Sequence, residues 1–129
     1  MNDPIARISA AVVPEPAGHY AQATAWRDLV FVSGQLGPRS DGSHTADQPF
    51  EVQVRQALTN LLAILAEAGS GPDRVLRVTA YIVGVENWPA FNRIYAEMFG
   101  EAKPARTVVP VPELHHGYLV EVDAIGTRG

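Results

Sequence analysis

The sequence predicts a single α+β domain in which two helices pack on one face of a β-sheet. Three observations support this fold class. The 129 residues are 47% hydrophobic and 19% charged, which suits one folded domain with a substantial core. Two segments repeat apolar residues every three or four positions, whereas the other segments are composed like strands. Because two helices are too few to cover both faces of such a sheet, we expect one face to be left open for another copy of the chain.

Three strands are expected before the first helix. A short strand is predicted over residues 6–13, and a second in YAQATAW, which ends at Trp26. The third strand, LVFVSGQL over residues 29–36, is the strongest prediction, although it contains Gly34. A glycine inside a strand often marks a bulge or a close approach by another group. The turn-forming residues of GPRSDGSHTADQ then predict an exposed loop.

The first helix should start after Pro49 and stop at Gly69, because apolar residues recur at helical spacing between them. RVLRVTAYIVG then predicts a strand. One of its faces holds Val75, Arg77, Thr79 and Tyr81, and the other holds Leu76, Val78, Ala80 and Ile82. A second helix is expected from an Asn87 cap to Gly100. Two strands, over about residues 106–111 and 118–125, complete the domain of residues 1–129.

Composition limits the classes of function. The net charge is −4 with scattered basic residues, so a nucleic-acid partner is disfavoured. The chain has no cysteine, which excludes disulfides, thiolate metal sites and a cysteine nucleophile. The N-terminus does not resemble a signal peptide, and no apolar run approaches the roughly 20 residues of a membrane span. We therefore expect a soluble cytoplasmic protein.

The most informative polar residue is Arg106, at the start of an apolar strand. A guanidinium keeps its proton, so it needs an anion or several carbonyls when buried. Arg106 could grip a substrate carboxylate, or it could pair with Glu121 or Asp123; spacing alone favours the ion pair. Glu121 could be a half-buried acid with a raised pKa, suited to acid–base chemistry, or an edge-strand charge that faces water. Sequence alone leaves both questions open.

Other polar residues have ordinary default roles. Asn92 is expected to be solvated or capping, Tyr20 to pack, and Ser33 to hydrogen-bond without acting as a nucleophile. Adjacent histidines in a strand point to opposite sides, which makes His115 and His116 a poor metal pair. No metal-ligand spacing and no phosphate-binding glycine motif is present, so no metal site is predicted.

The ordered segments of the chain nevertheless resemble those of the Rid family, the reactive intermediate/imine deaminases that are also called YjgF. The matching pieces are GHYAQA, LVFVSGQLG, VRQALTNLLAILAEAG, VLRVTAYIVGVENWPAFNRIYAEMF, KPARTVV and LVEVDAIG. Their order is more specific than any single piece, and together they cover nearly the whole chain after the first dozen residues.

The resemblance implies a chorismate-mutase-like fold with a mixed sheet and two helices on one face. It also implies a homotrimer in which the sheets form a central barrel with clefts between subunits. The implied reaction is the hydrolysis of 2-imino acids and their enamine tautomers to 2-keto acids and ammonia, without a cofactor. Carried over by position, the implied carboxylate clamp is Arg106 and the implied water-activating acid is Glu121. The implied residues of the cleft lining are Tyr20, Ser33, Gly34, Asn92 and Val108.

Three departures from the family pattern bear on the substrate range. His19 replaces a proline before the tyrosine, Val108 replaces a cysteine after the arginine, and His115 with His116 replaces a proline and a lysine. The alternative functions are a non-catalytic binder of small carboxylates or keto acids, and an endoribonuclease or translation inhibitor. A chorismate mutase is suggested by the fold alone, which is a weak argument.

Overall fold

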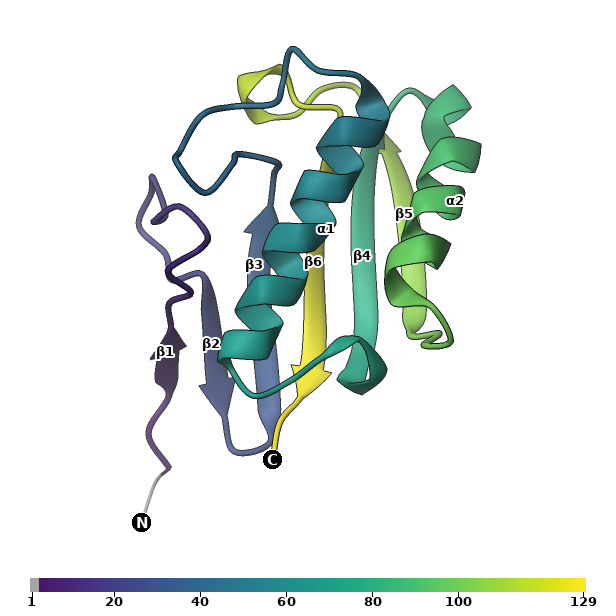
Figure 1. Ribbon diagram of the computed structural model, residues 1–129. Coiled ribbons are helices and arrows are strands. Elements are labelled where there is room, and N and C mark those ends of the chain that lie inside the picture. The colour runs from purple at the N-terminus through teal and green to yellow at the C-terminus, as the bar shows by residue number, and fades with distance from the viewer. Residues whose placement is uncertain (1–2) are drawn as a thin grey trace.

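The computed structural model describes residues 3–129 as one mixed sheet with two helices against the same face (Figure 1). The strand order is β1-β2-β3-β6-β4-β5, and only the β4–β5 pair is parallel. The strands are β1 Ala6–Ile8, β2 Ala23–Trp26, β3 Leu29–Gln35, β4 Val75–Val83, β5 Ala105–Val111 and β6 Val120–Thr127. The helices are α1 Phe50–Glu67 and α2 Trp88–Phe99, with short 3₁₀ turns at Pro72–Arg74, Val85–Asn87 and His115–Gly117. The predicted α+β class and the placement of both helices are confirmed.

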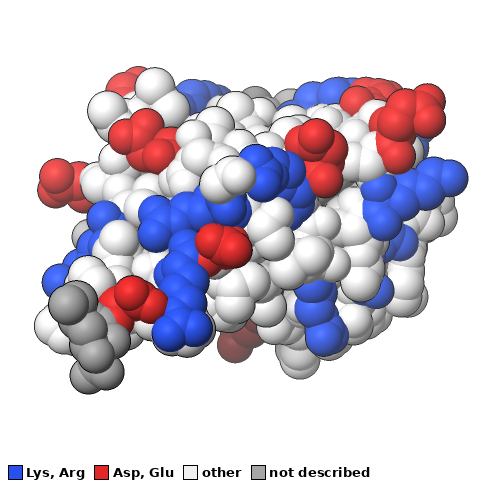
Figure 2. Space-filling model, turned by 90° about the horizontal axis from the view of Figure 1, so that it is seen from below, with Lys and Arg blue, Asp and Glu red and all other residues white. Residues whose placement is uncertain are grey.

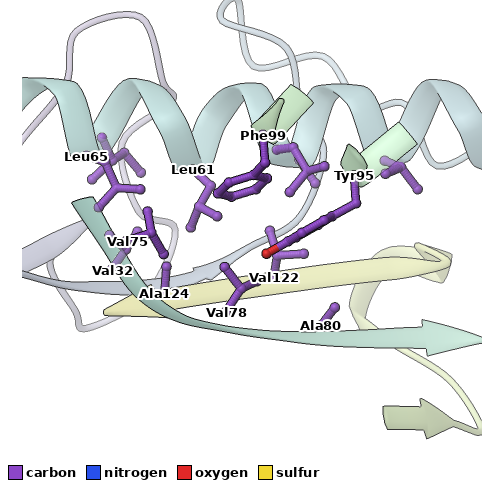
Figure 3. Close-up of a cluster of buried hydrophobic side chains, with 14 of the residues drawn as sticks. Val32, Leu61, Leu65, Val75, Val78, Ala80, Tyr95, Phe99, Val122 and Ala124 are labelled. Carbon is purple, nitrogen blue, oxygen red and sulfur yellow. The ribbon is translucent and has the colours of Figure 1, made fainter. Parts of the chain in front are cut away.

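The hydrophobic core lies between the helices and the sheet. In Figure 3, Leu61 and Leu65 of α1 and Phe99 of α2 point toward the valines and alanines of the central strands. Along β6 every second residue, starting at Val120, is buried against the helices. The intervening residues lie on the opposite face, where Phe31 is 43% exposed. That face is the uncovered side of the sheet, as the count of helices predicted.

Two strands differ from expectation for identifiable reasons. The first strand ends at Ile8 because the backbone N–H of Ala10 donates to the side chain of Gln22, at 2.7 Å, and not to a strand partner. In β4 a register shift between Val75 and Arg77 buries Val75 and leaves Leu76 50% exposed. The predicted faces of those two residues are therefore wrong.

Asn87 lies at the start of α2 as predicted, but its side chain does not cap the helix. Its amide nitrogen donates instead to the carbonyl of Val83, at 2.9 Å. Pro89 occupies the first turn of the helix and Gly100 ends it. None of the helices within residues 3–129 has the length and apolar composition needed to cross a membrane.

Gln53 of α1 fastens two loops that close the upper end of the sheet. Its side chain is fully buried. The amide oxygen accepts from the N–H of Leu119 at 2.8 Å, just before β6. The amide nitrogen donates to the carbonyls of Ala46 and Gln48, at 3.2 and 3.0 Å, in the loop before α1. One buried side chain thus links both segments to the helix.

We predict that Gln53→Leu lowers the free energy of unfolding by about 2 kcal/mol, because the volume is kept while the N–H of Leu119 loses its acceptor. Urea denaturation at fixed protein concentration measures this loss. Thr59→Leu, at an exposed position of the same helix, is the matched control and should change stability by less than about 0.5 kcal/mol. Equal effects of the two substitutions would contradict the role given to Gln53.

Candidate functional site

A cavity of about 640 Å³ opens at the upper end of the sheet, where β3 ends and β6 begins. Figure 1 shows the loop after β3 and the loop before β6 together at this end. The lining comes from four segments: the loop before β2, the end of β3 with the loop that follows it, the 3₁₀ turn at His115–Gly117, and β6. Among the candidate site residues, it includes Tyr20, Gly34 and Glu121.

Gly34 and Glu121 are in direct contact across the β3–β6 pair. A Cβ atom on residue 34 would lie 2.7 Å from Oε2 of Glu121, closer than such atoms approach one another. The register of β3 and β6 shifts between Val32 and Gln35, which confirms the bulge predicted from the glycine. The missing side chain therefore leaves the space that the carboxylate occupies.

Glu121 lies on a central strand and not on an edge, so the interpretation as an edge-strand charge is wrong. It is half-buried on the uncovered face, opposite Tyr81 of β4. Desolvation, and then the charge of Asp123, raise the pKa of Glu121, while His115 lowers it. A carboxyl group that holds its proton to higher pH than usual is suited to both accepting and delivering one.

Asp123 is the second acid of β6 and lies on the same face. Desolvation raises its pKa, and the nearby charge of Arg77 opposes that rise. Asp123 is not among the residues that line the cavity. Its position identifies it as a neighbour that influences Glu121 electrostatically.

The loop before β2 covers one side of the cavity and is held by Gln22. The buried side chain of Gln22 donates to the carbonyls of Val13 and Pro14, both at 3.2 Å. Ser33 secures the same loop, because its hydroxyl donates to the carbonyl of Ala21 at 2.7 Å. That bond agrees with the expectation that Ser33 hydrogen-bonds. Tyr20 follows in this loop with 53% of its surface exposed.

Arg106 and Asn92 form a second group on the opposite side of the sheet. Nη2 of Arg106 donates to Oδ1 of Asn92 at 2.8 Å. The guanidinium lies 4.9 Å from the ring centre of Tyr95 and 5.7 Å from that of Phe91. Burial raises the pKa of Tyr95 to about 12, and the charge of Arg106 opposes the rise. Asn92 is exposed, as the solvated alternative predicted, and its side chain also positions the guanidinium.

Arg106 and Glu121 do not meet within one chain. Arg106 pairs with Val78, which pairs with Ala124, and both of these neighbours are buried on the helix side. Glu121 belongs to the other face, and β4 separates their two strands. None of the ion pairs among residues 3–129 includes Arg106. The expected structural pair with Glu121 or Asp123 is therefore wrong, and Arg106 is exposed at the β5 edge of the sheet.

Val108 lies two residues further along β5, beside Ala80 of β4. It is half-buried and packs against the hydrophobic core. Like Arg106 it is not part of the cavity lining. Of the expected site residues, one group thus surrounds the cavity, whereas Arg106, Asn92 and Val108 cluster at α2 and β5.

Sequence reasoning missed a group of imidazoles at the cavity. His115 and His116 lie in a 3₁₀ turn and not in a strand, and their ring centres are 3.7 Å apart. His44, from the loop after β3, places its ring centre 4.7 Å from that of His116. The expectation that the adjacent histidines diverge fails because it assumed strand geometry. No local signal could have joined His44 to them, since the contact spans two loops distant in sequence.

The histidines do not make a metal centre with their neighbours. Within residues 3–129, no group of three or more His, Cys, Asp or Glu side chains is arranged to hold a metal ion. The side chains available for chemistry at the cavity include two carboxyl groups, three imidazoles and two phenols.

Comparisons with known proteins identify the family of this chain. The family model described as Endoribonuclease L-PSP matches residues 10–127. A RutC family protein of Pyrococcus horikoshii is 37% identical over 115 residues, which cover 89% of this chain and 91% of the relative. A protein of Dermatophagoides farinae named 2-iminobutanoate/2-iminopropanoate deaminase is 32% identical over 118 residues, with 92% of each chain covered.

Solved structures share the whole fold. A Yersinia pestis protein of unknown function from the Rid family aligns with a TM-score of 0.91 at 32% identity, over 96% of this chain and 99% of that chain. E. coli TdcF with bound serine aligns with a TM-score of 0.90 at 26% identity and the same coverage. Since a family model spans residues 10–127 and relatives at 32% and 37% identity match nearly their full length, the chain belongs to the Rid family.

Proposed function

We propose that this protein hydrolyses reactive 2-imino acids and their enamine tautomers to 2-keto acids and ammonia. The observation that carries the proposal is the half-buried Glu121 carboxyl on the wall of a cavity, in space that Gly34 leaves free. Relatives named for this reaction, from Dermatophagoides farinae and Capra hircus, support it at 32% identity each.

Glu121 supplies the acid–base chemistry of the proposed reaction. The substrate reacts as the protonated imine. The carboxylate of Glu121 takes a proton from a water molecule as the oxygen attacks the imine carbon, which gives a neutral tetrahedral carbinolamine. The protonated carboxyl returns that proton to the nitrogen, and the carboxylate then removes the hydroxyl proton as the carbon–nitrogen bond breaks. The carbonyl of the keto acid forms, ammonia leaves, and the proton passes from the carboxyl to ammonia as ammonium. A carboxyl with a raised pKa suits these transfers, because it is a stronger base when ionised and is regenerated by the last step.

Arg106 supplies the anchor for the substrate carboxylate. A forked guanidinium binds a carboxylate through two parallel hydrogen bonds and so fixes the orientation of the imine. Asn92 accepts from one nitrogen and the Tyr95 ring lies against the guanidinium, which holds the group while leaving its other N–H donors for a ligand. Because the neighbours of Arg106 are neutral, its charge remains available to an anion.

The two groups act together only between protomers. Glu121 and Arg106 lie on opposite sides of one sheet, so a single chain cannot apply both to a small substrate. We assign them to a homotrimeric assembly in which the β5 edge of one subunit faces the cavity of the next. The uncovered face of the sheet, with Phe31 at 43% exposure, supplies an apolar surface for that contact. Tyr20, Ser33 and Val108 complete the cleft, Val108 through its backbone carbonyl.

The alternative functions fit the surface less well. An endoribonuclease, the activity in the family model's description, needs a basic face for the phosphate backbone. Figure 2 shows basic and acidic side chains interspersed on the face that it displays, and the net charge is −4. A binder of small carboxylates would use the same Arg106 without turnover. Chorismate mutase chemistry has only the fold in its favour.

A coupled assay tests the proposed reaction. An amino-acid oxidase generates the imine, and keto-acid formation is followed with semicarbazide competing for the imine, with and without the purified protein. Faster imine loss in its presence supports the deaminase. Unchanged imine decay together with saturable keto-acid binding identifies the protein as a binder, and salt-sensitive RNA retardation in a gel favours the ribonuclease.

We predict that Arg106→Ala lowers kcat/KM for imine hydrolysis by about 100-fold or more, because the substrate loses its oriented carboxylate contact. Folding and assembly should persist, since Arg106 is exposed. Arg93→Ala is the matched control: Arg93 is an exposed arginine of α2 whose surface ion pairs reach Glu51 and Glu97. Full turnover by the Arg106 variant would remove the clamp from the mechanism.

We predict that Glu121→Gln slows turnover much more than it weakens keto-acid binding, because the amide keeps the shape but cannot accept the proton. In the unmodified protein, turnover should fall on acidification at a pH above the ordinary glutamate range, since the pKa of Glu121 is raised. A pH–rate profile measures both effects, and an unchanged acidic limb in the variant would exclude Glu121 as the titrating group.

The same substitution should not lower the free energy of unfolding at neutral pH. A carboxyl whose folded pKa lies above its unfolded pKa destabilises the fold when ionised, and this contribution disappears below the unfolded pKa. Replacing the charge by an amide removes the penalty at pH 7. A destabilised variant would identify Glu121 as structural.

A further inference from the structure

One wall of the cavity is built of aromatic rings that the proposed chemistry does not use. His44, His115 and His116 line it together with Tyr118. The ring centres of His115 and His116 are 3.7 Å apart, those of His44 and His116 are 4.7 Å apart, and His44 meets Tyr118 edge-on at 5.6 Å. Tyr20 lines the same cavity, and more than half of its surface is exposed. We call the three histidine rings, those of His44, His115 and His116, the imidazole wall.

A buried hydrogen-bond network orients one ring of the imidazole wall. Tyr118 is 1% exposed, so its hydroxyl needs partners inside the protein. The hydroxyl accepts from the backbone N–H of Thr45 at 3.2 Å and lies 2.8 Å from Nδ1 of His44. When it donates its proton to Nδ1, neutral His44 carries its own proton on Nε2. The buried phenol therefore holds the His44 ring in a fixed orientation.

Within the imidazole wall, His116 is shifted toward its neutral form. Desolvation, and then the neighbouring His115 and His44 rings, lower the pKa of His116. The cavity lining includes the acids Glu15 and Glu121 but no lysine or arginine. An anionic side chain on the substrate would therefore meet carboxylates without a permanent positive charge to offset them. A neutral side chain is the better match.

We propose that the cavity is the side-chain subsite for 2-imino acids that carry an aromatic ring, with that ring packed against the imidazole wall. This inference rests on the proposed deaminase function and specifies its substrate class. In one chain the cavity measures about 640 Å³, which leaves room for a ring beside the rest of the substrate. Aromatic pairs prefer offset or edge-on packing at centroid separations of roughly 4.5–7 Å, the range in which His44 packs against His116, at 4.7 Å, and against Tyr118, at 5.6 Å.

His116 offers a substitution that removes a ring without disturbing the turn. Its backbone is left-handed, at φ 60° and ψ 14°, a conformation that asparagine tolerates better than most residues. His116→Asn therefore keeps the turn and deletes the imidazole face. The matched control is Arg27→Asn, because Arg27 is exposed, has the same left-handed backbone at φ 53°, and does not line the cavity.

The experiment compares imines made by L-amino acid oxidase from L-phenylalanine and from L-leucine, with semicarbazide competing for each imine. For the unmodified protein, kcat/KM should be about tenfold higher for the phenylalanine imine than for the leucine imine, because the larger side chain fills the pocket. His116→Asn should lower the phenylalanine value roughly fivefold through the lost ring contact. The same variant should change the leucine value by less than about twofold, and Arg27→Asn should change neither.

Binding of the keto-acid products separates the two levels of the proposal. Calorimetry measures phenylpyruvate against 4-methyl-2-oxopentanoate for the unmodified protein and His116→Asn. If neither imine is processed but phenylpyruvate binds more tightly and depends on His116, the deaminase function fails and the aromatic subsite stands. If the leucine imine is processed equally well, or His116→Asn affects both substrates alike, the subsite is wrong and the function stands. Absence of both activity and preference overturns both.

Discussion

The site depends on a carboxylate held in the space of a missing side chain. Oε2 of Glu121 occupies a position that a Cβ at Gly34 would approach to 2.7 Å, and the bulged pairing of β3 with β6 sets that approach. The contact half-buries the acid and raises its pKa, mainly by desolvation. Holding the charge there costs folding free energy at neutral pH, so the arrangement is better explained by chemistry than by stability.

The strand order imposes the second constraint. With β4 between β5 and β6, the guanidinium of Arg106 lies on the helix side and the carboxyl of Glu121 on the uncovered side. An internal ion pair is thereby prevented, which leaves both charges free for other partners. The same geometry means that joint action on one substrate needs a second copy of the chain. The proposed trimer and the proposed chemistry therefore form one hypothesis, because the placement of Arg106 is explained only when both are taken together.

Much of the fold follows from local pattern. The helices, the strand at LVFVSGQ and the bulge at Gly34 were predictable because periodicity and glycine act over a few residues. The position of β6 in the middle of the sheet was not, since strand order depends on long-range pairing, and the edge-charge interpretation of Glu121 failed for that reason. Val75 and Leu76 exchange faces because a register shift in β4 has no sequence marker comparable to a glycine.

The candidate site divides in the same way. Individual residue types pointed to Arg106 and Glu121, whereas their relative placement needed the three-dimensional structure. The imidazole wall could not be predicted from the sequence, because the hydrogen bond between His44 and Tyr118 joins residues 74 positions apart. The partners of Asn92 were likewise hidden, since its contact with Arg106 connects a helix to an edge strand.

The loop between β5 and β6 connects substrate choice to acid strength. His115 lines the cavity beside Glu121, and its charge lowers the pKa that desolvation and Asp123 raise. Any side chain at this turn therefore acts on two properties at once: the shape of the side-chain subsite and the proton affinity of the acid. A change that enlarges the cavity by removing His115 also removes the one opposing influence on Glu121, so specificity and pH dependence cannot vary independently at that position.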